Sequence, residues 1–200
     1  NLITKQKAIE LASEMGKSHN KGLNNIAIIL KSKFVHEKNA NVSVNSPKVI
    51  RKEIRDNSIA YIKGINQYVN LTDTLKHTTN RILDTLYNSH SNYDLSIIKK
   101  SNTLKSYNNA LINILSDNNN LQELNIQIDL LKQKAINSIN DNHLLLQVLI
   151  PIEIAKNSLN YWHNNIGNWY EVFNGSNSLK DLDSFNWNWP WRTLALNDAE

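Results

Sequence analysis

Six histidines are the first residues to consider as catalytic or metal-binding groups. They lie at positions 19, 36, 77, 90, 143 and 163. No two of them are three or four residues apart, and none follows a glutamate by three positions. Zinc helices and di-iron bundles depend on such spacings, because these place two ligands on one face of a helix. The sequence therefore predicts neither a metal site nor a bound cofactor.

The other reactive side chains also lack the arrangement that catalysis needs. The chain has no Cys, which excludes cysteine nucleophiles, thiolate metal sites and structural disulfides. Lys63-Gly64 lacks the further glycines of a phosphate-binding loop, and no serine stands in a nucleophile elbow. No carboxylate pair is marked out as an acid and a base. We therefore predict that the protein is not an enzyme and has no catalytic residues.

Charge argues against a nucleic-acid partner. The chain carries 22 basic and 18 acidic side chains, for a net charge of +4, and the two signs are interspersed. Proteins that bind nucleic acid gather their Lys and Arg on one face. The densest basic groups here, at 51–55 and 99–105, are short, and we interpret them as solvated helix surface.

Aromatic residues in the last fifth of the chain are the one unusual feature of the composition. Trp169 precedes a turn at 174–176, and Trp187, Trp189 and Trp191 follow it around Pro190. Tryptophan combines a large apolar surface with one polar group, which suits it to packing, to protein interfaces and to membrane interfaces. Packing of a C-terminal segment over the end of the bundle is the interpretation we favour, and contacts of these four residues with a membrane or with a partner are the alternatives.

The elements that position these residues are long helices. Only 5 Gly and 3 Pro occur in 200 residues, which is too few for the frequent turns of an all-β fold. Apolar positions spaced by three and four form one stripe that predicts an amphipathic helix over residues 4–35: Leu11, Met15, His19, Leu23, Ile26, Leu30 and Phe34. The stripe keeps its phase through two glycines, so we predict one helix; a break at 20–22 is the alternative.

His19, Asn20 and Gly22 form a candidate structural motif within that helix. His19 is in phase with the apolar stripe, so we expect a buried neutral imidazole bonded to a carbonyl or an Asn. Asn20 and Gly22 suit a close helix crossing, because Gly admits a neighbouring backbone and Asn can bond across it. We favour a packing role for this motif, and a functional role of His19 is the alternative.

Further helices are predicted along the rest of the chain. Ser46-Pro47 is a helix start signal, and the helix runs to about residue 70. Others follow at about 72–86, 92–115 and, after a loop at 117–120, at 121–135. Residues 143–165 are the most continuously apolar, so we predict that this helix is the central one and that Pro151 kinks or restarts it. A last helix is predicted to start at Pro190.

Three stretches form a further pattern: Met15–Leu23, with an H-N-x-G-L core, Ala155–Trp162, with an A-K-x-S-x-x-Y-W pattern that ends in Tyr161-Trp162, and Trp191–Ala199. In this order they resemble a group of small exported helical proteins of Bacteroidota that has no established activity. The resemblance covers nearly the whole chain. It implies an N-terminal signal segment and a Gly/Ala-rich C-terminal tail like those of some bacteriocins, in which small residues let helices pack closely in lipid.

Together these observations predict an all-α protein: an antiparallel bundle of five to seven amphipathic helices with a Trp-rich C-terminal segment. Residues 1–173 are assigned to the bundle and 174–200 to that segment, which we expect to lead into a tail beyond Glu200. The start at Asn1 instead of Met predicts a removed signal segment and export to the periplasm, cell surface or exterior. We expect a non-enzymatic protein that acts at a membrane or on a partner such as an envelope protein, and a bacteriocin-like or toxin-like action is one form that this function could take. The alternative is a structural or accessory subunit of an envelope or extracellular assembly, including a homo-oligomer.

Overall fold

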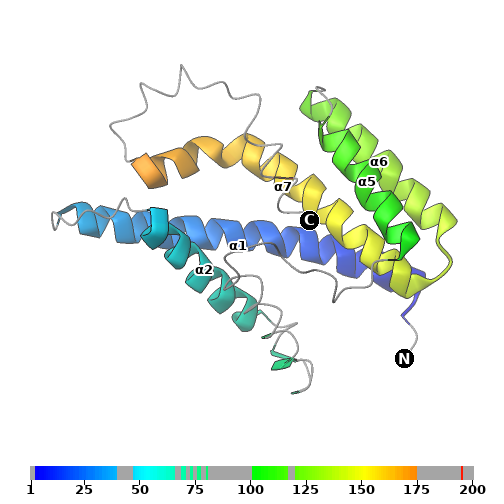
Figure 1. Ribbon diagram of the computed structural model, residues 1–200, viewed down its shortest axis with the longest axis horizontal. Coiled ribbons are helices and arrows are strands. Elements are labelled where there is room, and N and C mark those ends of the chain that lie inside the picture. Colours follow the sequence, from blue (N-terminus) through cyan, green and yellow to red (C-terminus); the bar gives the residue numbers. More distant parts are fainter. Residues whose placement is uncertain are drawn as a thin grey trace. The chain divides into compact units, whose positions relative to one another are not determined.

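The chain folds as a set of helices (Figure 1). The computed structural model describes residues 3–39, 47–65, 69–70, 73, 76–77, 80, 101–116, 120–174 and 195. Within these residues the helices are α1 (Lys5–Asn39), α2 (Pro47–Gly64), α5 (Asn102–Ser116), α6 (Leu121–Ser138) and α7 (Asn142–Asn174), and there is no strand. The all-α fold class predicted from the sequence is confirmed.

Short polar side chains fix where four of these helices begin. Thr4, Ser101, Asn120 and Asp141 each accept a hydrogen bond from the backbone N–H three residues later, at 3.2, 3.1, 3.0 and 3.1 Å respectively. The N–H groups of the first helical turn have no carbonyl partner inside the helix, and such caps supply one. The cap at Ser101 explains why α5 begins at Asn102. Residues 92–100 of the helix predicted over 92–115 lie outside the described residues.

Two long helices continue through positions at which the sequence analysis considered a break or a restart. α1 is unbroken through Gly16 and Gly22, which confirms one helix instead of two. α7 continues through Pro151 without restarting, and it extends past the predicted end at 165 to Asn174. α2 begins at Pro47 as predicted but ends at Gly64, short of residue 70. The predicted loop at 117–119, the turn at 175–176 and the start at Pro190 lie outside the described residues.

The chain divides into two compact units, and the division falls inside α1. One unit comprises Asn1–Lys21 with Lys100–Glu200, and the other comprises Gly22–Lys99. The boundary that the sequence suggested between residues 173 and 174 stays a prediction, because the segment after Asn174 is described only at residue 195.

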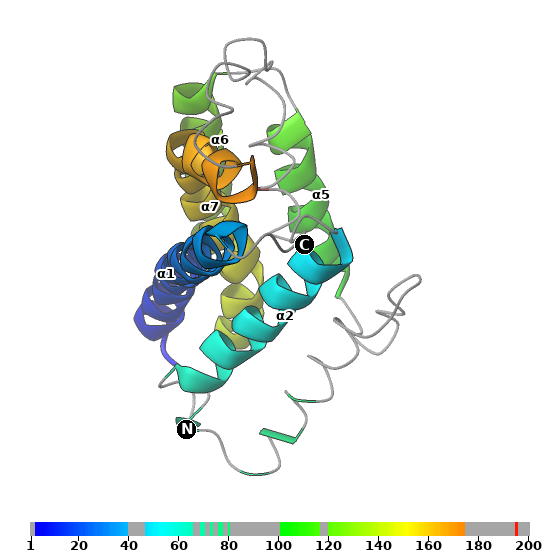
Figure 2. The same cartoon turned by 90° about the vertical axis from the view of Figure 1, so that its left-hand side faces the viewer.

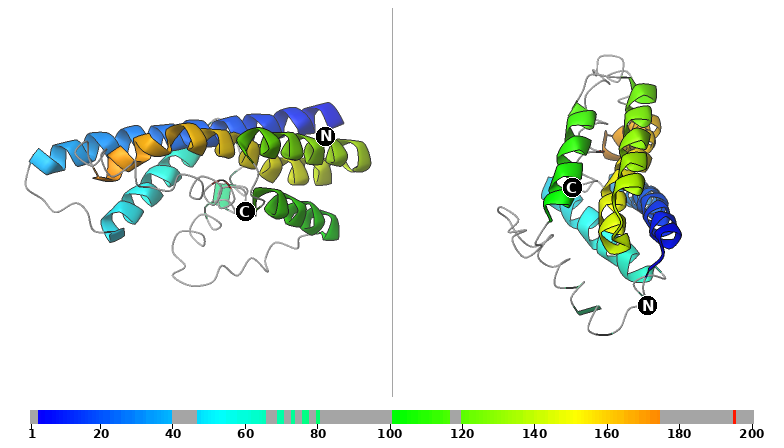
Figure 3. Two further views of the ribbon diagram at one scale, coloured as in Figure 1. Left: turned by 90° about the horizontal axis from the view of Figure 1, so that it is seen from above. Right: turned by 90° about the vertical axis from the view of Figure 1, so that its right-hand side faces the viewer.

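In the first unit, α5, α6 and α7 pack against one another (Figures 1 and 3). The short connection between α5 and α6 makes them an antiparallel hairpin, and Tyr107 Oη near the start of α5 lies 2.8 Å from Ser138 Oγ at the end of α6. Every described helix of this unit contributes to the core, which includes Leu111, Leu115, Leu124, Ile128, Leu145, Leu149, Ile152 and Leu159. α7 supplies more buried side chains than any other described helix, as predicted for the central one.

The N-terminal part of α1 lies along α7 in the parallel direction. Asn142 Nδ2, at the start of α7, donates to the carbonyl oxygen of Ile3 at 2.8 Å, and Asn20 Nδ2 donates to the carbonyl oxygen of Asn157 at 2.9 Å. The two helices therefore run in the same direction (Figure 3). The prediction of a wholly antiparallel bundle does not hold for this pair, because a long connection between α1 and α7 leaves either direction open.

The side of α1 that is buried in this unit carries small residues. Ala8, Ala12 and Gly16 recur every four positions and are buried, whereas Met15 of the predicted apolar stripe is 43% exposed. The stripe expected from hydrophobicity is therefore displaced by one residue, because close approach to α7 favours small side chains over large ones.

In the second unit, the C-terminal part of α1 pairs with α2 in the antiparallel direction (Figure 2). Lys33 Nζ lies 2.5 Å from Glu53 Oε1, and farther back along α1 the ring of Tyr61 lies against Gly22. A Cβ on Gly22 would stand 2.8 Å from Tyr61 Cε1, so this glycine makes room for the tyrosine ring. Burial raises the pKa of the Tyr61 hydroxyl above its ordinary value.

Candidate functional site: a polar junction on α7

Two of the three stretches that carry the family resemblance touch each other in the first unit. The segment Ala155–Trp162 occupies the middle of α7, and it meets the end of Met15–Lys21 on one side and α6 on another. We call this region, residues 153–162 of α7 with their partners on α1 and α6, the α7 junction. Its polar groups are the best candidates for a functional site among the described residues.

On the α1 side, Asn20 is held against the α7 backbone. Its Nδ2 donates to the carbonyl oxygen of Asn157 at 2.9 Å, and its Oδ1 lies 3.3 Å from Nδ1 of the part-buried His19. Asn157 in turn donates to the carbonyl oxygen of Glu153 at 2.8 Å. Asn20 thus bonds across a helix crossing, and His19 contacts an Asn but is part-buried, whereas the sequence analysis expected a buried imidazole.

Gly16 brings the two helix backbones together at this crossing. A Cβ placed on it would stand 2.7 Å from the carbonyl oxygen of Glu153 and 2.6 Å from Asn157 Nδ2. Real side chains do not approach backbone so closely, so only glycine permits this separation. Gly22, to which the sequence analysis gave that role, lies in the other unit against Tyr61 and allows a close approach there instead.

On the α6 side, three pairs of polar side chains form what we call the polar ladder. The Asn125 and Asn160 amides exchange hydrogen bonds at 3.2 and 3.0 Å. Asp129 Oδ1 accepts from Lys156 Nζ at 2.5 Å, and Lys132 pairs with Glu153. As the residue numbers on α6 rise from 125 to 132, those of their partners on α7 fall from 160 to 153. The two helices are therefore antiparallel, and these pairs define their register.

The pair of Lys132 and Glu153 is the most deeply placed charge pair of the ladder. The Glu153 side chain is only 5% exposed and that of Lys132 is 21% exposed. Glu153 Oε1 has no hydrogen bond of good geometry, so the nearby Lys132 ammonium is what compensates its charge. Removing a carboxylate from water is costly, and an ion pair of this kind recovers much of that cost only while both partners are present.

Aromatic rings cluster on α7 at the C-terminal end of the junction and just after it. Trp169 Nε1 donates to Tyr161 Oη at 2.8 Å, and the Trp162 ring lies 5.3 Å from that of Tyr161 and 5.4 Å from that of Trp169. All three side chains are buried. Tyr161 and Trp162 thus serve packing, as expected, and Trp169 shares that environment; its predicted contact with a membrane or partner stays a prediction. Trp187, Trp189 and Trp191 lie outside the described residues.

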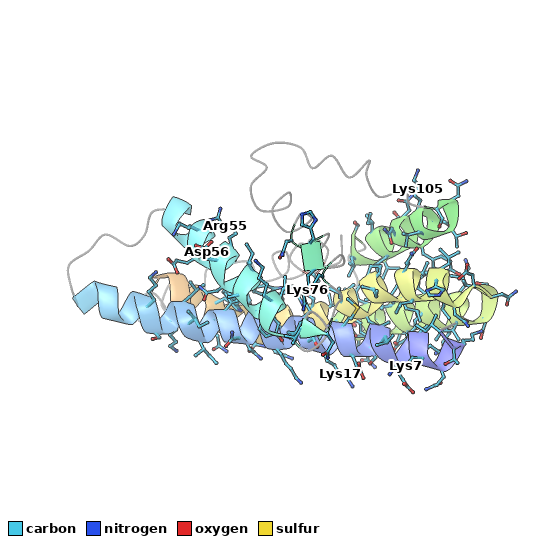
Figure 4. All side chains as sticks on the ribbon, turned by 90° about the horizontal axis from the view of Figure 1, so that it is seen from below. Lys7, Lys17, Arg55, Asp56, Lys76 and Lys105 are labelled. Carbon is cyan, nitrogen blue, oxygen red and sulfur yellow. The ribbon has the colours of Figure 1, made fainter. Side chains whose placement is uncertain are left out.

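The chemistry that the junction offers is hydrogen bonding and charge pairing between helices. Among the described residues, no group of three His, Asp or Glu side chains gathers closely enough to hold a metal ion. Within the same ranges, no helix combines the length and the apolar character needed to cross a membrane. Several other charged side chains of the described residues are at the surface. Lys7 and Lys17 are exposed on α1, and the hydrogen bond from Arg55 lowers the pKa of the exposed Asp56, with Lys52 contributing (Figure 4).

Sequence reasoning missed Gly16 and all three rungs of the polar ladder. A signal for Glu153 was present, since it is the one acidic residue in the apolar run of α7. The spacing of Asn125, Asp129 and Lys132 by four and three also places polar groups along one side of α6, but that spacing does not identify their partners.

Comparison with known proteins adds no relative. No family model, no curated protein and no solved structure matches the chain. The resemblance to the exported proteins of Bacteroidota stays a prediction.

Proposed function

We propose that the protein is a non-enzymatic helical protein that acts by binding a partner protein, as a structural or accessory subunit of an assembly at the cell envelope or outside the cell. The observation that carries the proposal is on α6. Ile126 and Leu130, one turn apart, are 53% and 65% exposed although both are large and apolar. Exposed apolar side chains that lie together are typical of surfaces that bind another protein.

The junction supports this proposal through what its residues do. Asn20, Asn125 and Asn160 bond to other helices, and the charges of Glu153 and Lys132 compensate each other. These groups stabilise the arrangement of α1, α6 and α7. A rigid set of helices that presents an apolar face suits a protein whose work is to hold a partner.

The experiment is to isolate the native protein from the cells that produce it and to measure the mass of the particle by light scattering. A particle much heavier than the chain supports the proposal. The competing proposal, a membrane-acting protein of the bacteriocin or toxin kind, rests on Trp187, Trp189 and Trp191. A native monomer that binds liposomes or makes them leak, and loses this on Trp187→Ala or Trp189→Ala, would favour it and overturn the assembly role.

A further inference from the structure

One face of α6 points away from the core of its unit. Leu124, Ile128, Leu131 and Ala135 are the buried side of the helix. The opposite side carries exposed residues: Gln122, Glu123, Ile126, Leu130, Gln133, Lys134 and Asn137. We call these seven the α6 outer face. Its two apolar residues lie at the centre, and polar residues lie toward both ends.

The charges of this face differ between its two ends. Glu123 lies about one turn before Ile126, and Lys134 lies about one turn after Leu130. Each residue turns the helix by about 100°, so the step from Glu123 to Lys134 is three full turns plus about 20°. The two side chains therefore leave the helix in nearly the same direction. They therefore stand on the same flank of the apolar pair, at nearly equal distances from its centre.

We propose that two copies of the chain associate through the α6 outer face, antiparallel about a two-fold axis that passes between Ile126 and Leu130. In an antiparallel pair, the same flank of each helix meets. Ile126 of one copy then packs on Leu130 of the other, and Glu123 faces Lys134 twice. A parallel pair would instead bring like charges to the same level. The face is thus complementary to itself in charge and in the placement of its apolar residues under one arrangement, as a two-fold interface requires.

The α6 outer face is small, so we expect the two copies to associate weakly. α6 has 18 residues and a length of about 27 Å, and two apolar residues per copy lie at its centre. Such a contact falls at the small end of specific interfaces, so we expect a reversible dimer that forms as the protein concentration rises. This inference rests on the proposed function, since it names a second copy of the chain as a partner.

The test is sedimentation of the purified full chain over a range of concentrations. We expect a monomer–dimer equilibrium for the native sequence and loss of the dimer in Leu130→Asp. Ile28→Asp is the matched control, because Ile28 is 69% exposed on α1 and lies outside the face. The control should dimerise like the native protein, and circular dichroism should show both variants folded, as expected for changes at exposed positions.

Charge exchange tests the antiparallel arrangement. Glu123→Lys and Lys134→Glu each place like charges opposite one another twice, and each should raise the dissociation constant roughly tenfold. The double variant carrying both changes should restore the dimer. A chain that stays monomeric at every concentration, a dimer that survives Leu130→Asp, or a double variant no better than the single ones would overturn the inference. If the purified chain is monomeric while the native particle is heavy, the dimer is wrong and the proposed function stands.

Discussion

Besides its contact with α5, α7 has two interfaces of different kinds, one with α1 and one with α6. The α1 interface is parallel and close: Gly16 admits the backbone of α7, and Asn20 bonds directly to a backbone carbonyl. The α6 interface is antiparallel and reaches across longer side chains, with Lys132 paired to Glu153 and Asp129 to Lys156. One interface is therefore limited by volume, and the other depends on matched charge.

The difference teaches how one helix can be placed unambiguously between two neighbours. A close contact through small residues tolerates no added atom, which fixes the distance between helices but only weakly fixes their sliding. A ladder of polar pairs tolerates changes of volume better, but a shift of one residue would leave the buried charge of Glu153 unmatched. We infer that the first interface determines spacing and the second determines register.

A charge in the shared core should break both interfaces at once. Leu149 is fully buried, whereas Leu146 is only part-buried, although the sequence pattern gave them equal weight. We expect Leu149→Asp to unfold the protein, because an unpaired carboxylate there has no water or partner. Leu146→Asp should lower the melting temperature and leave a folded protein. Thermal melts followed by circular dichroism decide this, and a native melt for Leu149→Asp would refute the central placement of α7.

Loss of one charge should damage the α6 interface more than any change of volume there. Lys132→Met leaves Glu153 without its compensating ammonium, at an expected cost near the lower end of about 3–5 kcal/mol, because Lys132 itself is partly solvated. Chemical denaturation measures the free energy of unfolding. Lys132→Met combined with Glu153→Leu should recover most of the loss; equal stability of the single and double variants would show that the pair is not coupled.

Added volume should instead damage the α1 interface. Gly16→Ala places a methyl group against the Glu153 carbonyl, and Gly167→Ala, also within a helix, meets nothing within 4 Å. Alanine favours a helix over glycine by about 1 kcal/mol, so Gly167→Ala should raise the free energy of unfolding by about 0.5–1 kcal/mol. Gly16→Ala should lower it, because overpacking costs about 1–3 kcal/mol. Stabilisation by both changes would mean that α1 and α7 are not in close contact.

The sequence was sufficient to predict the helices that the structure describes and the central place of α7. Spacing of apolar residues by three and four requires no knowledge of the partner, and Pro47 marks the start of α2 by its own geometry. Asn20 was also correctly assigned to a helix crossing. The end of α2 and the start of α5 were less accessible, since a cap such as Ser101 looks like many other serines in this chain.

The partners of the helices could not be predicted, and most errors follow from that. Hydrophobicity favoured Met15 over Gly16 for the buried side of α1, because it does not register that a close neighbour selects the smallest residue. The rungs of the polar ladder join residues 21 to 35 positions apart, and many Asn, Asp and Lys residues could have been paired on paper. Only the fold shows which pairs meet.

The middle rung of the ladder, the more exposed of its two charge pairs, gives the smallest expected effect and the sharpest test of the charge argument. Asp129 Oδ1 and Lys156 Nζ lie only 2.5 Å apart, but the two side chains are 48% and 32% exposed. Water already solvates both groups, so Asp129→Asn should cost about 0.2–1 kcal/mol, and that cost should shrink as salt is added. The cost of Lys132→Met, in contrast, should change little with salt, because Glu153 is shielded from the solvent. If the two variants lose equal stability and respond equally to salt, then burial does not set the value of a charge pair at this interface, and the register must be determined by the apolar contacts of α6 and α7 alone.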